Sequence, residues 1–452
     1  MIGYNQLRNK TTQECMQIAA KFYHARDFEN LERVLSFVLD SEPHNPAAVA
    51  TLGAMYILQD RYGMAEMTYT YGMKCAPGDK IMMSGLGTSI RSPERAEECY
   101  TWLKMVLEQD PNNTVALTNI ASMMVETCDY EGALEYAKKS LALKKDPQLA
   151  YSAIDACSLA YLGLEQFGKG FEMNRQSLGI KFRKEIIYGD EPRWEGEKDK
   201  VVIVYGEQGI GDEIFYGSVI PDAIKDCKKV IVVCDPRLEG LFKRSFKKAA
   251  VYGTRGKSAA WLDKHQWDAR CAMADLSYFY RKEKKDFPGK AFLKADPVRV
   301  AQWKETFKGK TKIGIAMRGG NKFTNRSLRT IPLEKFKPLL DYGDLVSLEY
   351  TDFDYGDFPI ETYPWATMSN VDYDHTAALV ASLDYVVTTA TSIVHLAGGL
   401  GIPCYVLRNK HYAWRYAHDM PWYNSVTIIP CDGDWDAGMK EALRLIEKEK
   451  AA

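Results

Sequence analysis

The stretch 206–216, GEQGIGDEIFY, places an acid directly after a glycine-rich turn. The apolar β-branched run VVIVY (201–205) leads into three glycines: Gly206, Gly209 and Gly211. A strand that feeds such a turn is typical of a phosphate cradle, but Asp212 would repel an anion there. If the phosphates bind elsewhere, the glycines let a sugar or acceptor come close, and Asp212 faces a neutral hydroxyl as a general base. The alternative is that Asp212 only caps the following helix, and Glu207 is a weaker candidate for the base or for a sugar contact.

A second segment, ATSIVHLAGGLGIP (390–403), has the features of an anion site. Thr391 and Ser392 are good helix N-caps directly after an expected strand, where backbone N–H groups and the helix dipole attract negative charge. We expect a nucleotide diphosphate to fit there. His395 lies one turn further along and either faces this site or is a packed, hydrogen-bonded histidine.

A third segment, MRGGNKFTNRSLRTIPL (317–333), carries four cations within twelve residues: Arg318, Lys322, Arg326 and Arg329. They directly follow another expected strand, so they could neutralise a leaving diphosphate, which arginine binds bidentately. The alternative is a solvated basic loop. Asp352 and Asp354 form an Asp-x-Asp pair, but they lie in an acidic loop outside the expected cleft, and we expect no metal site.

The elements that would position these residues form two α/β units. β-Branched runs alternate with helical stretches at 201–205, 229–235, 312–318, 345–350, 384–389 and 403–407. This alternation predicts parallel sheets covered on both faces, and ligands bind beyond the carboxyl ends of such strands. We therefore expect Rossmann-like domains over 181–300, which carries the candidate base on the acceptor side, and over 301–452, which carries the expected diphosphate site.

The first 180 residues repeat. Pro43, Pro77, Pro111 and Pro147 are 34, 34 and 36 residues apart, and ten residues after them stand the small residues Gly53, Gly87, Ala121 and Cys157. A 34-residue unit with small residues at facing positions predicts a tetratricopeptide-repeat helical solenoid of about five units over 1–180. The solenoid would bind a partner or acceptor on its concave face, or it would buttress the next domain or form a homo-oligomer.

The overall composition gives weaker limits. The 452 residues carry 59 basic and 60 acidic side chains, which argues against a dedicated nucleic-acid binder. No run approaches the roughly 20 apolar residues of a membrane span. The ten cysteines are scattered without paired spacing, so we expect reduced thiols and a cytoplasmic protein.

The ordered motifs give a family resemblance. The chain resembles tetratricopeptide-repeat glycosyltransferases and is similar to the ADP-heptose heptosyltransferases of glycosyltransferase family 9. The motifs that carry it span the chain: PRWEG (192–196), GEQGIGDEIFYGSVIP (206–221), RSLRTIPL (326–333), DHTAALVASLDYVV (374–387), TSIVHLAGGLGIP (391–403) and WRYAHDMPWY (414–423).

The resemblance implies an α + α/β chain in which the solenoid precedes a GT-B-type pair of Rossmann-like domains. It implies inverting, metal-independent sugar transfer from a nucleotide-diphosphate donor to a hydroxyl of a glycan, a protein or another polymer, without a cofactor. Asp212 matches the family's base, Arg329 its phosphate contact, and Thr391, Ser392 and His395 its diphosphate site.

Two positions depart from the family's pattern. Ala390 and His375 stand where relatives carry acids, which implies an unusual donor or reduced activity. Two alternatives therefore remain. One is a non-catalytic repeat scaffold with a decayed transferase domain. The other is a transferase acting on hydroxylated bases in DNA, suggested by the basic runs 242–248 and 280–285.

Overall fold

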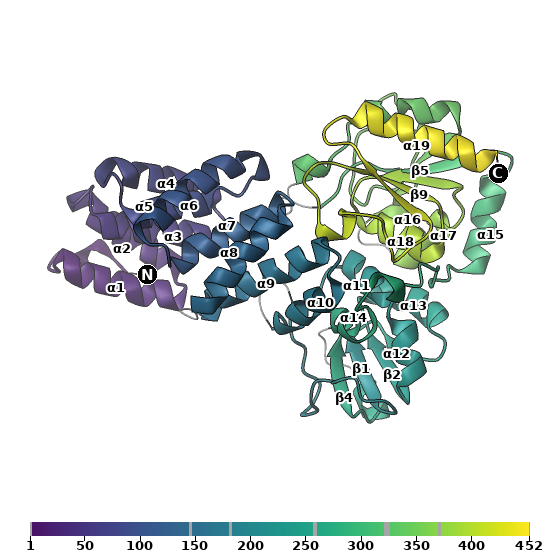
Figure 1. Cartoon of the computed structure of the whole chain (residues 1–452), viewed down its shortest axis with the longest axis horizontal. Helices are drawn as coiled ribbons and strands as arrows, with labels where there is room; N and C mark the ends of the chain where they lie inside the picture. The colour runs from purple at the N-terminus through teal and green to yellow at the C-terminus, as the bar shows by residue number, and fades with distance from the viewer. Residues whose placement is uncertain are drawn as a thin grey trace. The chain divides into compact units, whose positions relative to one another are not determined.

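The computed structural model describes residues 2–143, 147–179, 183–255, 260–320, 326–368 and 372–451. It divides the chain into two compact units, Met1–Cys157 and Ser158–Ala452. Figure 1 colours them from purple at the N-terminus to yellow at the C-terminus. The ten cysteines, all within the described residues, form no disulfide bond. Within the described residues, no helix combines the length and the apolar character needed to cross a membrane.

The first unit is built from consecutive pairs of packed helices (Figure 1). The pairs are α1 (Thr12–Ala25) with α2 (Phe28–Ser41), α3 (Pro46–Leu58) with α4 (Tyr62–Cys75), α5 (Lys80–Ser89) with α6 (Ala96–Gln109), and α7 (Thr114–Glu126) with α8 (Tyr130–Leu143); α9 (Pro147–Gly163) follows. The predicted tetratricopeptide-like helical repeat is therefore confirmed.

Small residues allow the paired helices to approach closely, as the spacing predicts. A Cβ atom on Gly53 would lie 2.6 Å from the ring of Tyr69, and one on Gly87 would lie 2.7 Å from Leu103. The hydroxyl of Tyr69 donates a hydrogen bond to the carbonyl of Ala50 at 3.3 Å. At these two positions, any residue larger than glycine would displace the side chain of the partner helix.

The turns inside the pairs also repeat. Arg26, Asp60 and Cys128 have φ angles of 54°, 57° and 65°, in the left-handed region that favours glycine. The third pair differs, because the 3₁₀ turn η2 (Pro93–Arg95) precedes α6.

The expected boundary at residue 180 differs from the division of the structure. Helix α10 (Phe167–Gln176) belongs to the second unit, because it packs on α14 (Leu276–Tyr280) and on the 3₁₀ turn η5 (Met273–Asp275). Phe167 lies 4.7 Å from Phe287, measured between ring centroids. The last helix of the expected solenoid therefore packs on helical segments of the first α/β domain.

The first sheet has four parallel strands in the order β3-β2-β1-β4. They are β1 (Val201–Tyr205), β2 (Lys229–Val233), β3 (Ala250–Tyr252) and β4 (Ala269–Ala272). Three helices follow β1 and β2: α11 (Ile210–Gly217), α12 (Ile220–Asp226) and α13 (Glu239–Ser245). One face of the sheet packs on Leu178 and Trp261.

The second sheet has six parallel strands in the order β10-β9-β8-β5-β6-β7. They are β5 (Lys312–Ala316), β6 (Asp344–Ser347), β7 (Ile360–Glu361), β8 (Tyr385–Thr388), β9 (Cys404–Arg408) and β10 (Val426–Pro430). The 3₁₀ helix η8 (Leu333–Asp341) and α19 (Trp435–Lys450) supply core residues to one face. The other helices are α15 (Pro297–Thr306), α16 (Pro364–Thr367), α17 (Tyr373–Val380) and α18 (Ser392–Leu400).

Both strand orders are those of Rossmann-like sheets, in which the order reverses beside the first strand. The reversal falls between β1 and β4 in the first sheet and between β5 and β8 in the second. All six predicted runs form strands, whereas β3, β4, β7 and β10 were not predicted. Because ligands of such sheets bind at the reversal point, the loops after β1, β5 and β8 are the places to examine.

Candidate functional site

The loops after β5 and β8 meet at the reversal point of the second sheet. A Cβ atom on Gly319 would lie 2.5 Å from the carbonyl oxygen of Ala390, so only glycine fits there. Thr391 is the N-cap of α18, and its hydroxyl accepts a hydrogen bond from the backbone N–H of Ile393 at 3.2 Å. Ser392 begins the helix and accepts a hydrogen bond from the Tyr373 hydroxyl at 3.3 Å. The predicted helix start is present.

The loop after β1 leads directly to this helix start. Gly209 is the N-cap residue of α11, and Asp212 lies in the first turn without capping it. A Cβ atom on Gly211 would lie 3.1 Å from the Cβ atom of Ser392. Gly211 therefore allows close approach of α11 to α18, whereas the sequence suggested close approach to a sugar. The two walls that we expected to face each other across a cleft are in contact here.

An arginine from a third element completes this contact. Arg415 lies in the 3₁₀ turn η9 (Trp414–Tyr416), and its Nη2 donates to Asp212 Oδ1 at 2.8 Å. Its Nη1 lies 3.4 Å from Nε2 of His395. The guanidinium carbon is 4.6 Å from the centre of the Phe215 ring. The predicted base is therefore one half of an ion pair that joins the two sheets.

His395 is buried, with 2% of its surface exposed. Nε2 contacts the Tyr416 hydroxyl at 3.3 Å, and Nδ1 has no hydrogen-bond partner in the part of the chain that the structure describes. Burial and then the charge of Arg415 hold the pKa of His395 well below its usual range. A neutral, packed histidine fits this environment better than a side chain that faces a bound diphosphate.

The four predicted cations have different environments. Arg318 is engaged by the buried Glu349, with Nε 2.9 Å from Oε2, and also donates to the carbonyl and hydroxyl of Thr351. Arg318 thus stabilises the loop after β5 through contacts within the protein and does not face a ligand. Lys322 lies outside the described residues.

The other two cations form the ends of a 3₁₀ turn, η7 (Arg326–Arg329). The carbonyl of Arg329 accepts a hydrogen bond from Gly319 at 3.0 Å, which ties this turn to the loop after β5. Nη2 of Arg326 is buried without a hydrogen-bond partner in the described chain. Burial raises the pKa of Tyr416 to about 12 against the opposing charges of Arg415 and Arg329, so these two arginines lie near the same phenol.

Glu207 is not available as a base. It is buried, with 8% exposed, and its Oε1 lies 3.0 Å from Nη2 of Arg183. The same nitrogen lies 2.6 Å from Oδ1 of Asp275. Burial raises the pKa of Glu207 and of Asp275, while Arg183 opposes that shift. This cluster ties the linker before β1 to the ends of β1 and β4.

The sequence did not identify two further charged contacts, one on α11 and one between α13 and α17. Glu213 is buried beside Arg255 and accepts a hydrogen bond from the backbone of Asp235 at 2.8 Å. Arg244 of α13 forms an ion pair with Asp374 of α17, and so it is a second charged link between the sheets. Asp374 and Arg415 both lie in quoted motifs, but the motifs do not identify their partners.

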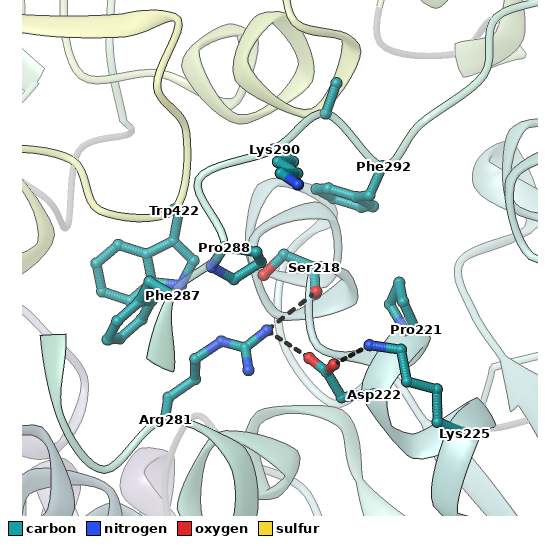
Figure 2. A pocket seen from close by; sticks show the side chains of 11 residues that line it. Ser218, Pro221, Asp222, Lys225, Arg281, Phe287, Pro288, Lys290, Phe292 and Trp422 are labelled. Carbon is teal, nitrogen blue, oxygen red and sulfur yellow. Dashed lines mark hydrogen bonds and ion pairs between the residues drawn. The ribbon is translucent and has the colours of Figure 1, made fainter. Parts of the chain in front are cut away.

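A pocket of about 270 Å³ lies at the C-terminal end of α11, and Figure 2 shows the side chains that line it. Arg281 projects into its floor and donates to Asp222 at 2.7 Å and to the carbonyl of Ser218 at 3.5 Å. Trp422 forms one wall, and its ring lies 4.5 Å from that of Phe215. Because Phe215 also lies beneath Arg415, these two rings separate the pocket from the Asp212–Arg415 pair.

Asp352 and Asp354 are engaged in local loop contacts. Oδ1 of Asp354 accepts a hydrogen bond from the backbone of Gly356 at 2.9 Å, and the carbonyl of Asp352 accepts one from Arg318 at 3.3 Å. Within the described ranges, no three or more His, Cys, Asp or Glu side chains gather as a metal site would require.

Comparison with known proteins assigns no family to the chain. No model of a known protein family matches it. It is 24% identical over 478 residues to Protein FlbA of Caulobacter vibrioides, a match that covers 91% of this chain and 80% of FlbA.

Solved structures are similar to part of the chain. PilW, a widely conserved type IV pilus biogenesis factor, is 18% identical with a TM-score of 0.34, covering 37% of this chain and 77% of its own. TTC0263, a thermophilic TPR protein in Thermus thermophilus, is 14% identical with a TM-score of 0.33, covering 37% and 90%.

Proposed function

We propose that the second unit is an inverting, metal-independent glycosyltransferase of the GT-B type. The sugar would pass from a nucleotide-diphosphate donor to a hydroxyl of a glycan, a protein or another polymer. The observation that supports this most directly is the meeting of α11 and α18. It brings the carboxylate of Asp212 and the N-terminus of α18 together at the carboxyl ends of both sheets.

The donor diphosphate would bind at the start of α18. Thr391 and Ser392 offer backbone N–H groups and hydroxyls, and the helix dipole adds roughly half a positive charge. Arg326 and Arg329, on the adjoining turn η7, would neutralise the charge that grows on the leaving group. Lys322 remains a candidate from the same loop. Donors already in place are typically worth about 3–4 kcal/mol each in such a site.

Asp212 would accept the proton of the acceptor hydroxyl. The acceptor oxygen forms a bond to the anomeric carbon as the bond from that carbon to the phosphate oxygen breaks, and the nucleotide diphosphate leaves with the electron pair. Attack opposite the leaving group inverts the anomeric configuration. The contact between α11 and α18 means that the two sheets must separate locally to admit the substrates.

The repeats of the first unit would present the acceptor or a partner protein. Helical repeats offer extended concave surfaces for this purpose, and the same surface could mediate self-association. The alternative of a non-catalytic scaffold is supported by Ala390, which stands where the resembled family carries an acid.

The test begins with a panel of nucleotide-diphosphate sugars, with UDP-, GDP-, ADP- and dTDP-linked donors, scored by thermal stabilisation. Transfer is then measured as released nucleotide. We expect Asp212→Asn to keep donor binding and to lose about 10²–10⁴-fold in transfer, the usual contribution of a general base.

The control is Asp341→Asn, which changes an exposed aspartate at the end of η8 and should leave transfer unchanged. Full transfer by Asp212→Asn would rule out the base. Stabilisation by no donor, together with no nucleotide release, would favour the scaffold.

A further inference from the structure

Arg415 contacts both helices that meet in the proposed site, α11 and α18. It bonds to Asp212 on α11 at 2.8 Å and lies 3.4 Å from His395 on α18. Its guanidinium lies over the Phe215 ring, which fixes its plane. The side chains of Arg415 and Asp212 are 15% and 28% exposed, so the pair is partly accessible from solvent.

Apart from Asp212, the titratable groups that face Arg415 are neutral near pH 7. They are Tyr216 on α11, His395 on α18, Tyr416 on its own turn, and Tyr423. Burial raises the pKa of Tyr216 and of Tyr416 to about 12, raises that of Tyr423 as well, and lowers that of His395. In the described parts of the chain, Asp212 is the carboxylate that balances Arg415.

This pairing engages one of the two oxygens of Asp212 in the structure as it stands. Oδ1 accepts the guanidinium hydrogen bond, so only Oδ2 can receive the proton of an alcohol while the pair is closed. Opening of the pair frees both oxygens for the acceptor.

An anion at the start of α18 would be a direct competitor for Arg415. Ser392 opens that helix, and its Cβ atom lies 3.1 Å from where a Cβ atom on Gly211, the neighbour of Asp212, would stand. A diphosphate carries more charge than one carboxylate, and a guanidinium binds two of its oxygens at once. Part of Arg415 is also unused, because its buried Nε has no hydrogen-bond partner in the described chain.

We propose that Arg415 is a positioning residue that holds Asp212 until the donor diphosphate draws it away, so that the donor binds before the base is released. This inference rests on the proposed transfer at the same site, and it adds an order of binding. It also explains why a cation and a base occupy one contact: the free protein keeps the base engaged, and the donor releases it.

The test measures how exposed the Asp212 carboxylate is, without any need for turnover. The full chain is treated with a water-soluble carbodiimide and glycine ethyl ester, with and without inorganic pyrophosphate, and labelling at Asp212 is quantified by peptide mass spectrometry. Labelling of the exposed Asp341 serves as the internal standard.

We expect Arg415→Gln to raise labelling of Asp212 about fivefold, the change in population that a partly exposed ion pair supports. Pyrophosphate should raise labelling of the natural protein by a similar factor and leave Arg415→Gln unchanged. Arg415→Lys, which keeps the charge, should restore most of the protection and the response. A residue with a merely structural role would give no response to pyrophosphate.

The control is Arg193→Gln, which removes one arginine 2.8 Å from Glu185 and leaves Arg270 3.3 Å from the same carboxylate. It should leave the labelling of Asp212 unchanged. Pyrophosphate that fails to raise, or that lowers, labelling of Asp212 in the natural protein would overturn the inference, and this arm decides even if Arg415→Gln does not fold. Transfer activity without this response would refute only Arg415's role, whereas the response without transfer would refute only the proposed function.

Discussion

The two units bury different kinds of side chain. In the described part of the first unit, the buried polar side chains are three hydroxyls: Ser89, Thr118 and Ser140. In that of the second unit, ten charged or imidazole side chains are buried: Arg183, Glu207, Glu213, Asp235, Asp275, Arg281, Lys312, Glu349, Asp374 and His395. Burial of a charge is unfavourable unless it is paired, so only the second unit depends on such pairs.

The range of the contacts differs in the same way. In the first unit, Thr118 bonds to Ser140, one helix further along the chain, at 2.8 Å. In the second, Asp212 pairs with Arg415 from the other sheet. The comparison teaches that the first unit is held by contacts between neighbours, while the second depends on charges brought together from distant segments.

The variant with the largest expected effect on stability is Arg183→Met, which removes the cation between Glu207 and Asp275. Two buried carboxylates then lose their partner, and we expect the free energy of unfolding to fall by about 3–5 kcal/mol. Urea titration followed by tryptophan fluorescence reports this, because eight of the nine tryptophans lie in the second unit.

The matched control lies in the first unit. Arg33→Met breaks an exposed pair with Glu29, whose side chains are 46% and 65% exposed, and should change stability by less than about 1 kcal/mol. Equal losses in the two variants would remove the distinction between the units.

The second test uses pH. Burial raises the pKa of Glu213 from 4.5 to about 7, with Arg255 opposing the shift. The folded state then binds this proton more tightly than the unfolded state, so stability from this group is present below pH 4.5 and is lost as the pH rises through about 7. Glu213→Gln should reduce the slope of the free energy of unfolding against pH by at most about 1.4 kcal/mol per pH unit. Urea titration at several pH values measures this slope.

A carboxylate of the first unit should behave in the opposite way. Hydrogen bonding to Arg95 lowers the pKa of Glu66, so its contribution is present above pH 4.5 and is lost as the pH falls. If Glu66→Gln and Glu213→Gln change the pH dependence in the same direction, the electrostatic contrast is wrong.

The third test addresses packing in the first unit. Gly53→Ala places a methyl group 2.6 Å from the Tyr69 ring, and we expect a loss of about 1–3 kcal/mol from overpacking. Gly63→Ala is the control, since no atom lies within 4 Å of its added methyl and alanine favours the helix. Thermal unfolding monitored by circular dichroism separates them, and similar melting temperatures would contradict the packing argument.

The smallest expected effect is a gain. Arg26→Gly relieves a left-handed residue at φ 54° and should stabilise the first unit by about 1 kcal/mol. Lys21→Gly, in the middle of α1, should cost about as much, because glycine weakens a helix interior. Chemical denaturation monitored by circular dichroism gives both values, and a loss in Arg26→Gly would show that the turn is not strained.

Much of the fold could be predicted from local pattern. The repeat follows from spacing alone, because each pair packs on the next, and VVIVY (201–205) matches β1 residue for residue. Three of the missed strands are short or lack a β-branched run; β4 (Ala269–Ala272) contains Arg270 and has no β-branched residue. Such strands form because neighbouring strands offer hydrogen bonds, which no local pattern reveals. The fourth, β10 (Val426–Pro430), carries a β-branched run that was not predicted as a strand.

The site was less predictable for a related reason. The N-cap role of Thr391 depends on neighbouring residues and was found. The partners of Asp212 and of Glu207 depend on the fold, because Arg415 and Arg183 are distant in sequence. Sequence could suggest which residues carry charge, but only the fold determines which charges are already paired and which remain to meet a ligand.

Because the first unit repeats every 34 residues, whole repeats could be deleted or inserted. Excision of residues 43–76 would join Glu42 to Pro77 in the register that Pro43 occupies, and a duplication there would likewise keep every small residue opposite its neighbour. Each helix pair contacts mainly the next pair. Whole repeats could therefore be added or removed, by evolution or by design, without changes to the candidate site in the second unit.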